Sequence, residues 1–377
     1  MNILVITDNY PATYNPSRGV FLYSLVQEFI KNGHQATVVA PEFIQNIRFN
    51  RNSYGTENAY VFRPIALSLS SVRIFGWDSY MVGDFSFRKA IARGLKKINL
   101  LQVDLIYCHF LWNWIYSEPI LGQLGKPVVV AVGENIMLAK IRSKYEVDRY
   151  QRAIDRVTGY IAVSETVKQV LISDHSIPCS KIIVAQNGVD LDKYKSLNRL
   201  DLRKKYNISK NDFVVIFVGR MVEAKGPIRV LNAVHKIGGC KLIFAGGGPQ
   251  QPQGPNVIFS KAVPPNLVPE LLTLSDIFVL PTLHEGSCNA IIEALAAGLP
   301  IVSSDLPEIR EQIDATCSIL IDPIDVAKIS NAIILLRDNI NIRQQMGLNS
   351  IRKSKYFDLH ERSKKILKFL ENILIEY

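Results

Sequence analysis

The chain has 377 residues, of which 48% are hydrophobic, and its formal net charge is +10. That length predicts two domains, and the apolar content excludes a disordered or low-complexity protein. The basic surplus is compatible with anionic partners, but no nucleic-acid motif is present and the basic residues are not interleaved with aromatic ones, which argues against nucleic-acid binding.

The N-terminus and the cysteines predict a cytoplasmic protein. The segment NILVIT (2–7) enters a strand at once, without the basic and long apolar regions of a signal peptide. The longest apolar runs, such as residues 105–115, are too short to span a bilayer. The five cysteines are scattered and show neither a CxxC pair nor a metal-ligand spacing, as is typical of a reducing compartment.

In the first half of the chain, short β-rich runs alternate with helical runs. The strand at 2–7 is followed by a helical pattern at 19–34 and a second strand at 36–41, which together predict a βαβ unit in which Gly33 ends the helix. Further buried strands are predicted at 104–110, 127–132, 159–164 and 182–187.

A second series of apolar strands follows a polar, turn-rich junction at 185–207. These strands are predicted at 213–220, 241–247, 276–282 and 300–305. Apolar strands separated by helices indicate parallel sheets that are covered on both faces. The predicted fold class is therefore α/β, with two doubly wound, Rossmann-like domains.

The domain boundaries follow from the junction and from the last helix. We place an N-terminal domain at 1–186, a C-terminal domain at 187–357 and a terminal helix at 358–377, which we expect to pack back towards the N-terminal domain. The apolar residues that support a packed helix are Ile366, Leu367, Phe369, Leu370, Ile373 and Leu374.

The segment EGSCNAIIEALAAGLP (285–300) directly follows a predicted strand. Ligands of doubly wound folds bind at the carboxyl ends of strands, near helix N-termini. Glu285 precedes the helix and Glu293 lies inside it, so two carboxylates can accept hydrogen bonds from a sugar or a ribose. The small residues 286–288 allow a ligand to approach the backbone. The alternative is that Glu285 caps the helix and Glu293 forms a surface ion pair.

A second cluster lies in FVGRMVEAKG (217–226). Arg220 ends a predicted strand and Lys225 follows in the strand-to-helix loop. Two cations at such a loop suit a diphosphate, although they could also be exposed surface residues. A diphosphate clamp together with a pair of hydroxyl-binding carboxylates indicates a nucleotide sugar as the ligand.

With these motifs the sequence resembles the retaining GT-B glycosyltransferases of family 4, the "glycosyl transferases group 1". The resemblance is weaker over 14–41 and 163–171 and densest over 185–315. There it rests on NGVD (187–190), VGRMVEAKG (218–226), AGGGP (245–249), LPTLHEGSCNAIIEALAAGLPIVSSD (280–305) and Glu311.

The resemblance implies two Rossmann-like domains facing across a cleft, with 1–186 as the acceptor-side domain and 187–357 as the nucleotide-sugar-binding domain. It also implies transfer, with retention, of a hexose or hexose derivative from a nucleoside diphosphate sugar to a glycan or lipid-linked glycan acceptor. Surface polysaccharide biosynthesis is the expected process. The nucleoside diphosphate sugar is a co-substrate, and we expect no cofactor.

The same resemblance assigns roles to individual residues. Arg220 and Lys225 would hold the donor diphosphate and stabilise its developing charge. Glu293 would bind the ribose hydroxyls, and Glu285 would face the transferred sugar, so that Glu285, Arg220 and Lys225 are the catalytic candidates. Further donor contacts are expected from Gly19 in the N-terminal domain and from Gly286, Ser287, Cys288 and Asn289, with the amides of 286–288 facing sugar or phosphate oxygens.

The sequence departs from the family pattern after the predicted strand at 127–132. Many relatives have His-Gly-x-Asp at this place, with the His contacting the donor sugar, whereas this chain has Val132 and Asn135 in place of the His and the Asp. Glu134 could substitute as a sugar contact or could be a turn residue. His109 could contact acceptor or sugar, or could be a core histidine.

No metal site is predicted. The pair Asp190 and Asp192 resembles the DxD metal motif of the other glycosyltransferase fold, but it lies in a turn, which aspartate commonly caps. A cationic clamp also removes the need for a metal ion. The glycine run 246–248 lacks the order of a dinucleotide-binding fingerprint.

Two other functions remain open at this point. One is a GT-B sugar-nucleotide epimerase or hydrolase, and the other is a catalytically silent nucleotide-sugar-binding subunit.

A basic and aromatic part of the N-terminal half also predicts weak peripheral association with the inner membrane face. Its residues are Arg48, Arg51, Arg63, Arg73, Trp77, Arg88 and Lys89.

Overall fold

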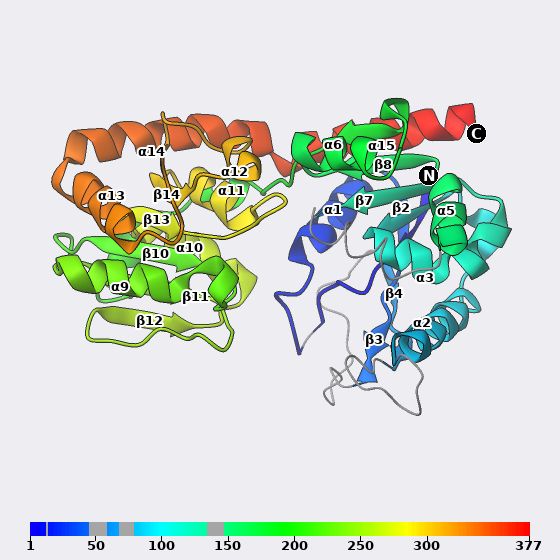
Figure 1. Cartoon of the computed structure of the whole chain (residues 1–377), viewed down its shortest axis with the longest axis horizontal. Coiled ribbons are helices and arrows are strands. Elements are labelled where there is room, and N and C mark those ends of the chain that lie inside the picture. The colour runs from blue at the N-terminus through cyan, green and yellow to red at the C-terminus, as the bar shows by residue number, and fades with distance from the viewer. Residues whose placement is uncertain (13, 45–58, 68–78, 134–146) are drawn as a thin grey trace. The chain divides into compact units, whose positions relative to one another are not determined.

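The computed structural model describes residues 1–12, 14–44, 59–67, 79–133 and 147–377. The chain forms two compact units, which are considered one at a time (Figure 1). The first unit contains Met1–Ala185 together with Ser363–Tyr377, and the second contains Gln186–Arg362.

The first unit is built on a parallel sheet with the strand order β4-β2-β1-β6-β7-β8-β9. Its strands are β1 (Asn2–Ile6), β2 (Gln35–Val39), β4 (Tyr60–Phe62), β6 (Leu105–His109), β7 (Val128–Val132), β8 (Gly159–Ala162) and β9 (Ile182–Val184), and a separate pair is formed by β3 (Glu42–Phe43) and β5 (Ile65–Ala66). Its helical elements are α1 (Val20–Lys31), α2 (Ser79–Leu95), η2 (Leu100–Gln102), α3 (Leu111–Leu121), η3 (Gly122–Leu124), α5 (Val147–Asp155), α6 (Glu165–Ser173), η4 (Cys179–Lys181) and most of α15 (Leu359–Glu376).

Strand β1 shows why both faces of this sheet are buried. Because successive side chains of a strand point to opposite faces, Ile3 and Val5 pack with α1, while Leu4 and Ile6 pack with the core residues of α2, α3 and α5. Helix α15 adds its apolar stripe to the same core as α1. The buried residues of this stripe are Ile366, Leu367, Leu370 and Ile373, and Phe369 and Leu374 pack beside them.

The second unit is built on a parallel sheet with the order β12-β11-β10-β13-β14-β15. Its strands are β10 (Val214–Val218), β11 (Lys241–Ala245), β12 (Val257–Lys261), β13 (Ile277–Leu280), β14 (Ile301–Ser304) and β15 (Ser318–Ile321). Its helical elements are α7 (Asp192–Lys195), α8 (Arg199–Lys205), η5 (Glu223–Lys225), α9 (Pro227–Ile237), η6 (Pro265–Leu267), α10 (Val268–Leu274), α11 (Asn289–Ala296), α12 (Pro307–Arg310), α13 (Val326–Asp338), α14 (Ile340–Ser354) and η7 (Lys355–Phe357).

Both sheets reverse their strand order at one place. In the second unit the chain runs from β10 outwards to β11 and β12, then returns to the other side of β10 with β13, β14 and β15. Helices α9 and α13 pack against each other (Figure 1). Helix α10, which connects β12 to β13, contacts α11, which connects β13 to β14. The turns after β10 and β13 therefore meet at a topological switch point, which is where doubly wound folds bind ligands.

The predicted α/β class with two doubly wound sheets is confirmed. No helix in the described parts of the chain has the length and apolarity needed to cross a membrane.

Candidate functional site

The turn after β10 is fixed by its contact with the turn after β11. The amide of Met221 donates to the carbonyl oxygen of Gly247 at 2.9 Å. A side chain on Gly246 would overlap the carbonyl oxygen of Gly219, so the glycine permits this close approach. Arg220 is thereby held at the carboxyl end of β10. Its side chain is exposed and forms no hydrogen bond or ion pair with the residues that the structure describes.

The turns after β10 and β13 lie against each other. Gly226 precedes α9 with a φ of +75°, and a Cβ there would lie 2.7 Å from the carbonyl oxygen of Pro281. The amide of Leu283 donates to the carbonyl oxygen of Ala224 at 2.7 Å. The neighbouring Lys225 is therefore placed directly beside the segment that carries Glu285.

Lys225 and Glu285 form an ion pair. Lys225 Nζ lies 2.5 Å from Glu285 Oε1, and the two side chains are only 14% and 11% exposed. Lys225 Nζ also donates to the carbonyl oxygen of His284 at 3.2 Å. Two residues from separate sequence motifs thus form one ion pair. The positive charge of the neighbouring Arg220 has no such anionic partner among the described residues.

The segment 286–288 is held by side chains from elsewhere in the second unit. Gln312 Oε1 accepts a hydrogen bond from the amide of Cys288 at 2.9 Å, and Asn187 Nδ2 donates to the carbonyl oxygen of Ser287 at 3.1 Å. The expectation that the Cys288 amide faces a ligand is therefore wrong, because Gln312 occupies it. Burial raises the pKa of the Cys288 thiol well above its usual range, so this thiol is not a nucleophile.

Helix α11 carries two polar groups without a partner among the described residues. Glu293 is largely buried and its carboxylate makes no hydrogen bond there. Burial raises its pKa to about 7, against the opposing effect of Lys193. Asn289 Oδ1 is also buried without a hydrogen-bond partner. A ligand with hydroxyl groups could satisfy both acceptors, since unpaired buried polar groups are costly.

Gly19 and His109 both lie at the switch point of the first unit, Gly19 directly before α1 and His109 at the end of β6. Gly19 caps α1 with a φ of +65°, and a side chain there would overlap the carbonyl oxygen of Asn9, so its close approach is to its own turn. His109 ends β6 and is buried, with its ring centroid 5.2 Å from that of Phe21 on α1. His109 is therefore part of an aromatic cluster that adjoins the switch point.

Asp8 is a candidate that the sequence reasoning missed. It follows β1 and accepts hydrogen bonds from Asn113 Nδ2 at 3.0 Å and from Trp112 Nε1 at 3.3 Å. Its signal in the sequence is an acidic residue directly after the first strand, where a doubly wound fold binds ligands.

Several other expectations concern residues outside the pair of switch points. Val132 is a buried residue of β7. Arg63 was expected to face lipid, but this is wrong, because its side chain is 7% exposed and pairs with Glu42 at 2.7 Å. Asp190 Oδ1 accepts the amide hydrogen bond of Asp192 at 3.1 Å, which is a turn-capping role. The residues Arg48, Arg51, Arg73, Trp77, Glu134 and Asn135 lie outside the described part of the chain.

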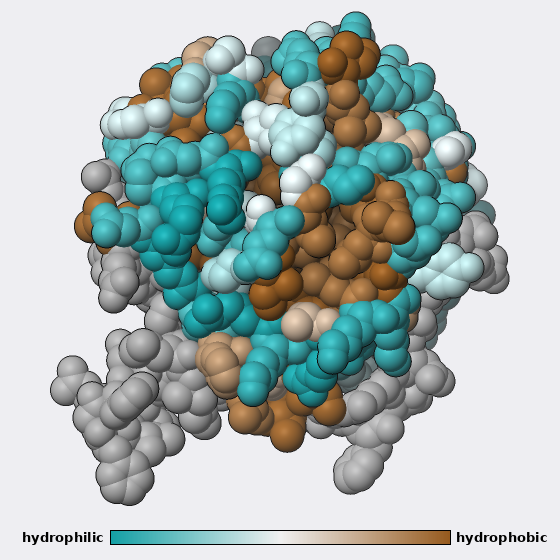
Figure 2. Space-filling view, turned by 90° about the vertical axis from the view of Figure 1, so that its right-hand side faces the viewer, coloured by the Kyte–Doolittle hydropathy of each residue, from teal (hydrophilic) through white to brown (hydrophobic). Residues whose placement is uncertain are grey.

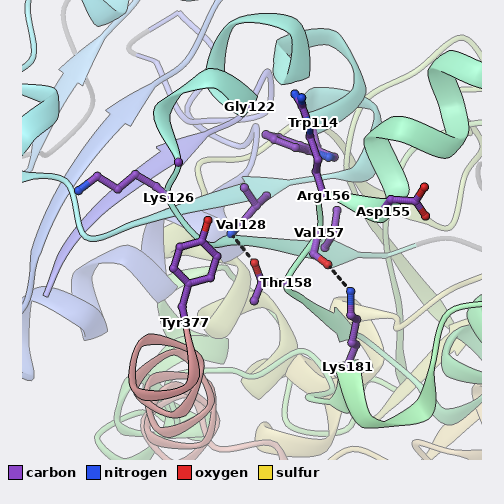
Figure 3. A pocket seen from close by; sticks show the side chains of 11 residues that line it. Trp114, Gly122, Lys126, Val128, Asp155, Arg156, Val157, Thr158, Lys181 and Tyr377 are labelled. Atoms are coloured by element: carbon purple, nitrogen blue, oxygen red, sulfur yellow. Dashed lines mark hydrogen bonds between the residues drawn. The ribbon is translucent and has the colours of Figure 1, made fainter.

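A cavity of about 390 Å³ lies elsewhere in the first unit (Figure 3). It is lined by Val128, which begins β7, and by Thr158, which directly precedes β8, with the ring of Tyr377 beside them. These are the amino ends of the strands, whereas doubly wound folds bind their ligands at the carboxyl ends. The cavity is therefore separate from the candidate site.

Two family models match the chain. The one described as Glycosyltransferase Family 4 matches residues 19–193, and the one described as Glycosyl transferases group 1 matches residues 198–353. The first model thus covers most of the first unit, and the second covers most of the second unit, including the Arg220 turn and α11.

Individual relatives agree with these matches. The chain is 24% identical over 348 residues to the "Putative teichuronic acid biosynthesis glycosyltransferase TuaC" of Bacillus subtilis (strain 168), which covers 88% of each chain. It is 28% identical over 293 residues to an Escherichia coli protein, the "UDP-Gal:alpha-D-GlcNAc-diphosphoundecaprenol alpha-1,3-galactosyltransferase", which covers 70% of this chain and 74% of that one. The Anabaena protein HepE, solved in complex with UDP and glucose, is 16% identical with a TM-score of 0.75, covering 98% of this chain and 99% of that one.

Proposed function

The chain belongs to family 4 of the glycosyltransferases and has their GT-B fold, and on this premise we propose its reaction. It transfers a hexose or hexose derivative from a nucleoside diphosphate sugar, with retention at the anomeric carbon. The acceptor is a glycan or a lipid-linked glycan, and the product serves surface polysaccharide biosynthesis.

The observation that carries the donor proposal is the charge arrangement at the switch point of the second unit. Arg220 is an exposed cation, and Lys225 shares an ion pair with Glu285 in the adjoining turn. A diphosphate is the ligand that brings two negative charges to two such cations. On α11, Asn289 Oδ1 is buried without a hydrogen-bond partner among the described residues, and the Glu293 carboxyl lies on the same helix; both suit the hydroxyls of the same ligand.

The proposed chemistry uses these groups without a protein nucleophile. The bond between the anomeric carbon and the phosphate oxygen breaks, and its electron pair goes to the leaving diphosphate. Arg220 and Lys225 stabilise that charge as it develops, which lowers the barrier. The acceptor hydroxyl attacks from the same face of the sugar, and its proton passes to the leaving phosphate. Glu285 faces the transferred sugar.

The names of the relatives support the substrate classes. The Escherichia coli relative is named for a UDP-galactose donor and a diphosphoundecaprenol-linked acceptor, and the Bacillus subtilis relative for teichuronic acid biosynthesis. HepE was solved with UDP and glucose. These names favour a nucleoside diphosphate hexose as the donor and a lipid-linked glycan as the acceptor of this chain.

A lipid-linked acceptor would require contact with a membrane surface, and we propose that α2 provides it. Phe85, Lys89 and Arg93 of α2 are all exposed and follow each other at helical spacing, with Lys89 Nζ 4.5 Å from the centroid of the Phe85 ring, and the exposed Lys96 directly follows the helix. A stripe of cations beside an exposed aromatic residue is attracted weakly to anionic lipid. Figure 2 shows apolar residues gathered within hydrophilic surroundings on one face of the first unit. We place the protein in the cytoplasm, in weak contact with the inner membrane face.

The test is product formation from a panel of UDP, GDP, ADP, CDP and dTDP sugars, each with and without a lipid-linked glycan acceptor. We expect a glycosylated product, with the nucleoside diphosphate released at an appreciable rate only when the acceptor is present. Release at the same rate without acceptor indicates a hydrolase, and an altered sugar on an intact nucleotide indicates an epimerase. Binding without turnover of any donor indicates a silent nucleotide-sugar-binding subunit.

A further inference from the structure

The short segment 286–288, here called the donor loop, directly follows the turn that carries Glu285, and its Cys288 side chain is buried in the core of the second unit. It consists of Gly286, Ser287 and Cys288, and α11 begins directly after it without a side-chain hydrogen bond from its cap residue Cys288. Backbone groups that are to contact a donor must be held within a fraction of an ångström of the productive geometry. The groups that hold this loop therefore come from other parts of the fold.

Gln312, which follows α12, holds the loop from one side. Its side chain is buried, with the residue only 1% exposed. Its Oε1 accepts from the amide of Cys288 at 2.9 Å, while its Nε2 donates to Ser287 Oγ and to the carbonyl oxygen of Cys288, both at 3.3 Å. One carboxamide thus contacts the loop at three atoms.

Asn187 holds the loop from the other side. Its amide donates to Ser287 Oγ at 3.3 Å, and its Nδ2 donates to the carbonyl oxygen of Ser287 at 3.1 Å. Asn187 Oδ1 in turn accepts from Nη2 of Arg362 at 3.5 Å. Ser287 therefore lies between two carboxamide side chains that reach it from distant parts of the sequence.

We infer that Gln312 is a positioning residue of the transfer reaction, with Asn187 as its counterpart. Gln312 acts by holding the donor loop in the geometry that the donor requires, and it does not touch the donor itself. This inference rests on the proposed function, because it assigns the loop to donor binding. A purely structural role would instead make Gln312 important for stability and indifferent for the donor.

The decisive variant is Gln312→Met, which keeps the length of the side chain and removes its polar atoms. We expect kcat/KM for the donor to fall about tenfold, since preorganised geometry is lost. The KM for the acceptor should stay within about threefold of the wild-type value, because the inference assigns the loop to the donor alone. The control is Ser350→Ala, which removes another buried hydrogen bond of the second unit, from Ser350 Oγ to the carbonyl oxygen of Leu299 at 2.7 Å.

A second variant carries the test if Gln312→Met does not fold. Gln312→Asn keeps the carboxamide without adding a charge but shortens the side chain by one methylene, which withdraws its polar atoms from the loop. Its donor kcat/KM should therefore also fall, and by more than that of Ser350→Ala. The inference is overturned if both Gln312 variants have the wild-type kcat/KM for the donor, or if Ser350→Ala lowers this kcat/KM equally at a similar Tm. Neither result affects the proposed function. If the wild-type chain neither binds nor uses any nucleoside diphosphate sugar, the proposed function fails and this inference fails with it.

Discussion

Lys225 Nζ lies 2.5 Å from Glu285 Oε1, so the cation expected to bind the donor diphosphate and the acid expected to face the transferred sugar are already paired with each other. The pair joins the turn after β10 to the turn after β13, and both side chains are largely buried. Each member therefore keeps the other charge compensated until a diphosphate offers Lys225 a second anionic partner.

The Lys225–Glu285 pair predicts that Lys225→Met has two separable effects. The single variant should lose about 1–3 kcal/mol of unfolding free energy, because Glu285 keeps a buried charge without its cation. Affinity for the nucleoside diphosphate should fall about tenfold to a hundredfold, as expected for a lost charged hydrogen bond.

The double variant Lys225→Met/Glu285→Gln is the matched control for this prediction. It should recover much of the stability, because the unpaired charge is gone, while nucleotide binding stays weak. Chemical denaturation and calorimetric titration measure the two effects. Full recovery of nucleotide affinity in the double variant would show that Lys225 does not contact the diphosphate.

Glu293 predicts a dependence of stability on pH. Burial raises its pKa in the folded chain from 4.5 to about 7, so the folded state binds this proton more tightly than the unfolded state. The stabilisation from that proton is complete below pH 4.5 and is lost as the pH rises through about 7. Between pH 5 and pH 8, Glu293→Gln should therefore gain about 1–3 kcal/mol relative to the wild type.

Unfolding free energies of both proteins at pH 5 and pH 8 check this expectation. Glu376→Gln serves as the control, because it makes the same change of side chain at an exposed position. A Glu293→Gln difference that is independent of pH would show that Glu293 is ionised throughout this range.

Transfer should not require a divalent metal ion. The expected charge stabilisation comes from Arg220 and Lys225, and Asp190 is engaged in capping its own turn. Activity in excess EDTA should persist at close to its original rate. A complete loss that added Mg²⁺ restores would contradict this prediction.

The exposed stripe on α2 predicts weak, salt-sensitive binding to anionic vesicles. Screening by salt should weaken the attraction, and Lys89→Glu/Arg93→Glu should reduce the fraction that sediments with the vesicles. The control Lys204→Glu/Lys236→Glu changes the net charge equally at exposed positions of the second unit. Equal absence from anionic and neutral vesicle pellets at low salt would refute membrane association and leave the enzymatic proposal intact.

The central strands could be predicted from the sequence because burial on both faces makes them continuously apolar. The strand expected at 213–220 is β10, Val214–Val218, and the strand expected at 300–305 is β14, Ile301–Ser304. Strand β12 was missed, because it lies at the edge of the sheet and is only partly buried, so its apolar run is limited to the three residues 257–259. Helix α8 was likewise hidden in a polar junction, where Asn198 caps it.

From the sequence, residues of the candidate site could be grouped only when they belong to the same motif. Arg220 and Lys225 share one turn, so their proximity was legible. The pairing of Lys225 with Glu285 depends on β10 and β13 being neighbours, and strand order cannot be read from apolar periodicity. Gln312 carried no signal, because its contact with Cys288 is made by the folding of a distant turn onto the donor loop.

The most direct test of the nucleotide-sugar proposal is calorimetric titration of nucleoside diphosphate into Glu285→Gln and Glu293→Gln, paired with turnover at saturating donor. Ribose hydroxyls are the same in ground and transition states, so Glu293→Gln should weaken nucleotide binding about tenfold to a hundredfold. Glu285→Gln should leave that affinity within about threefold and lower kcat by about tenfold or more, because the transferred sugar changes charge and shape. The opposite pattern would show that the two roles are exchanged, and unchanged binding and rate in both variants would contradict the assignment of this site to a nucleotide sugar.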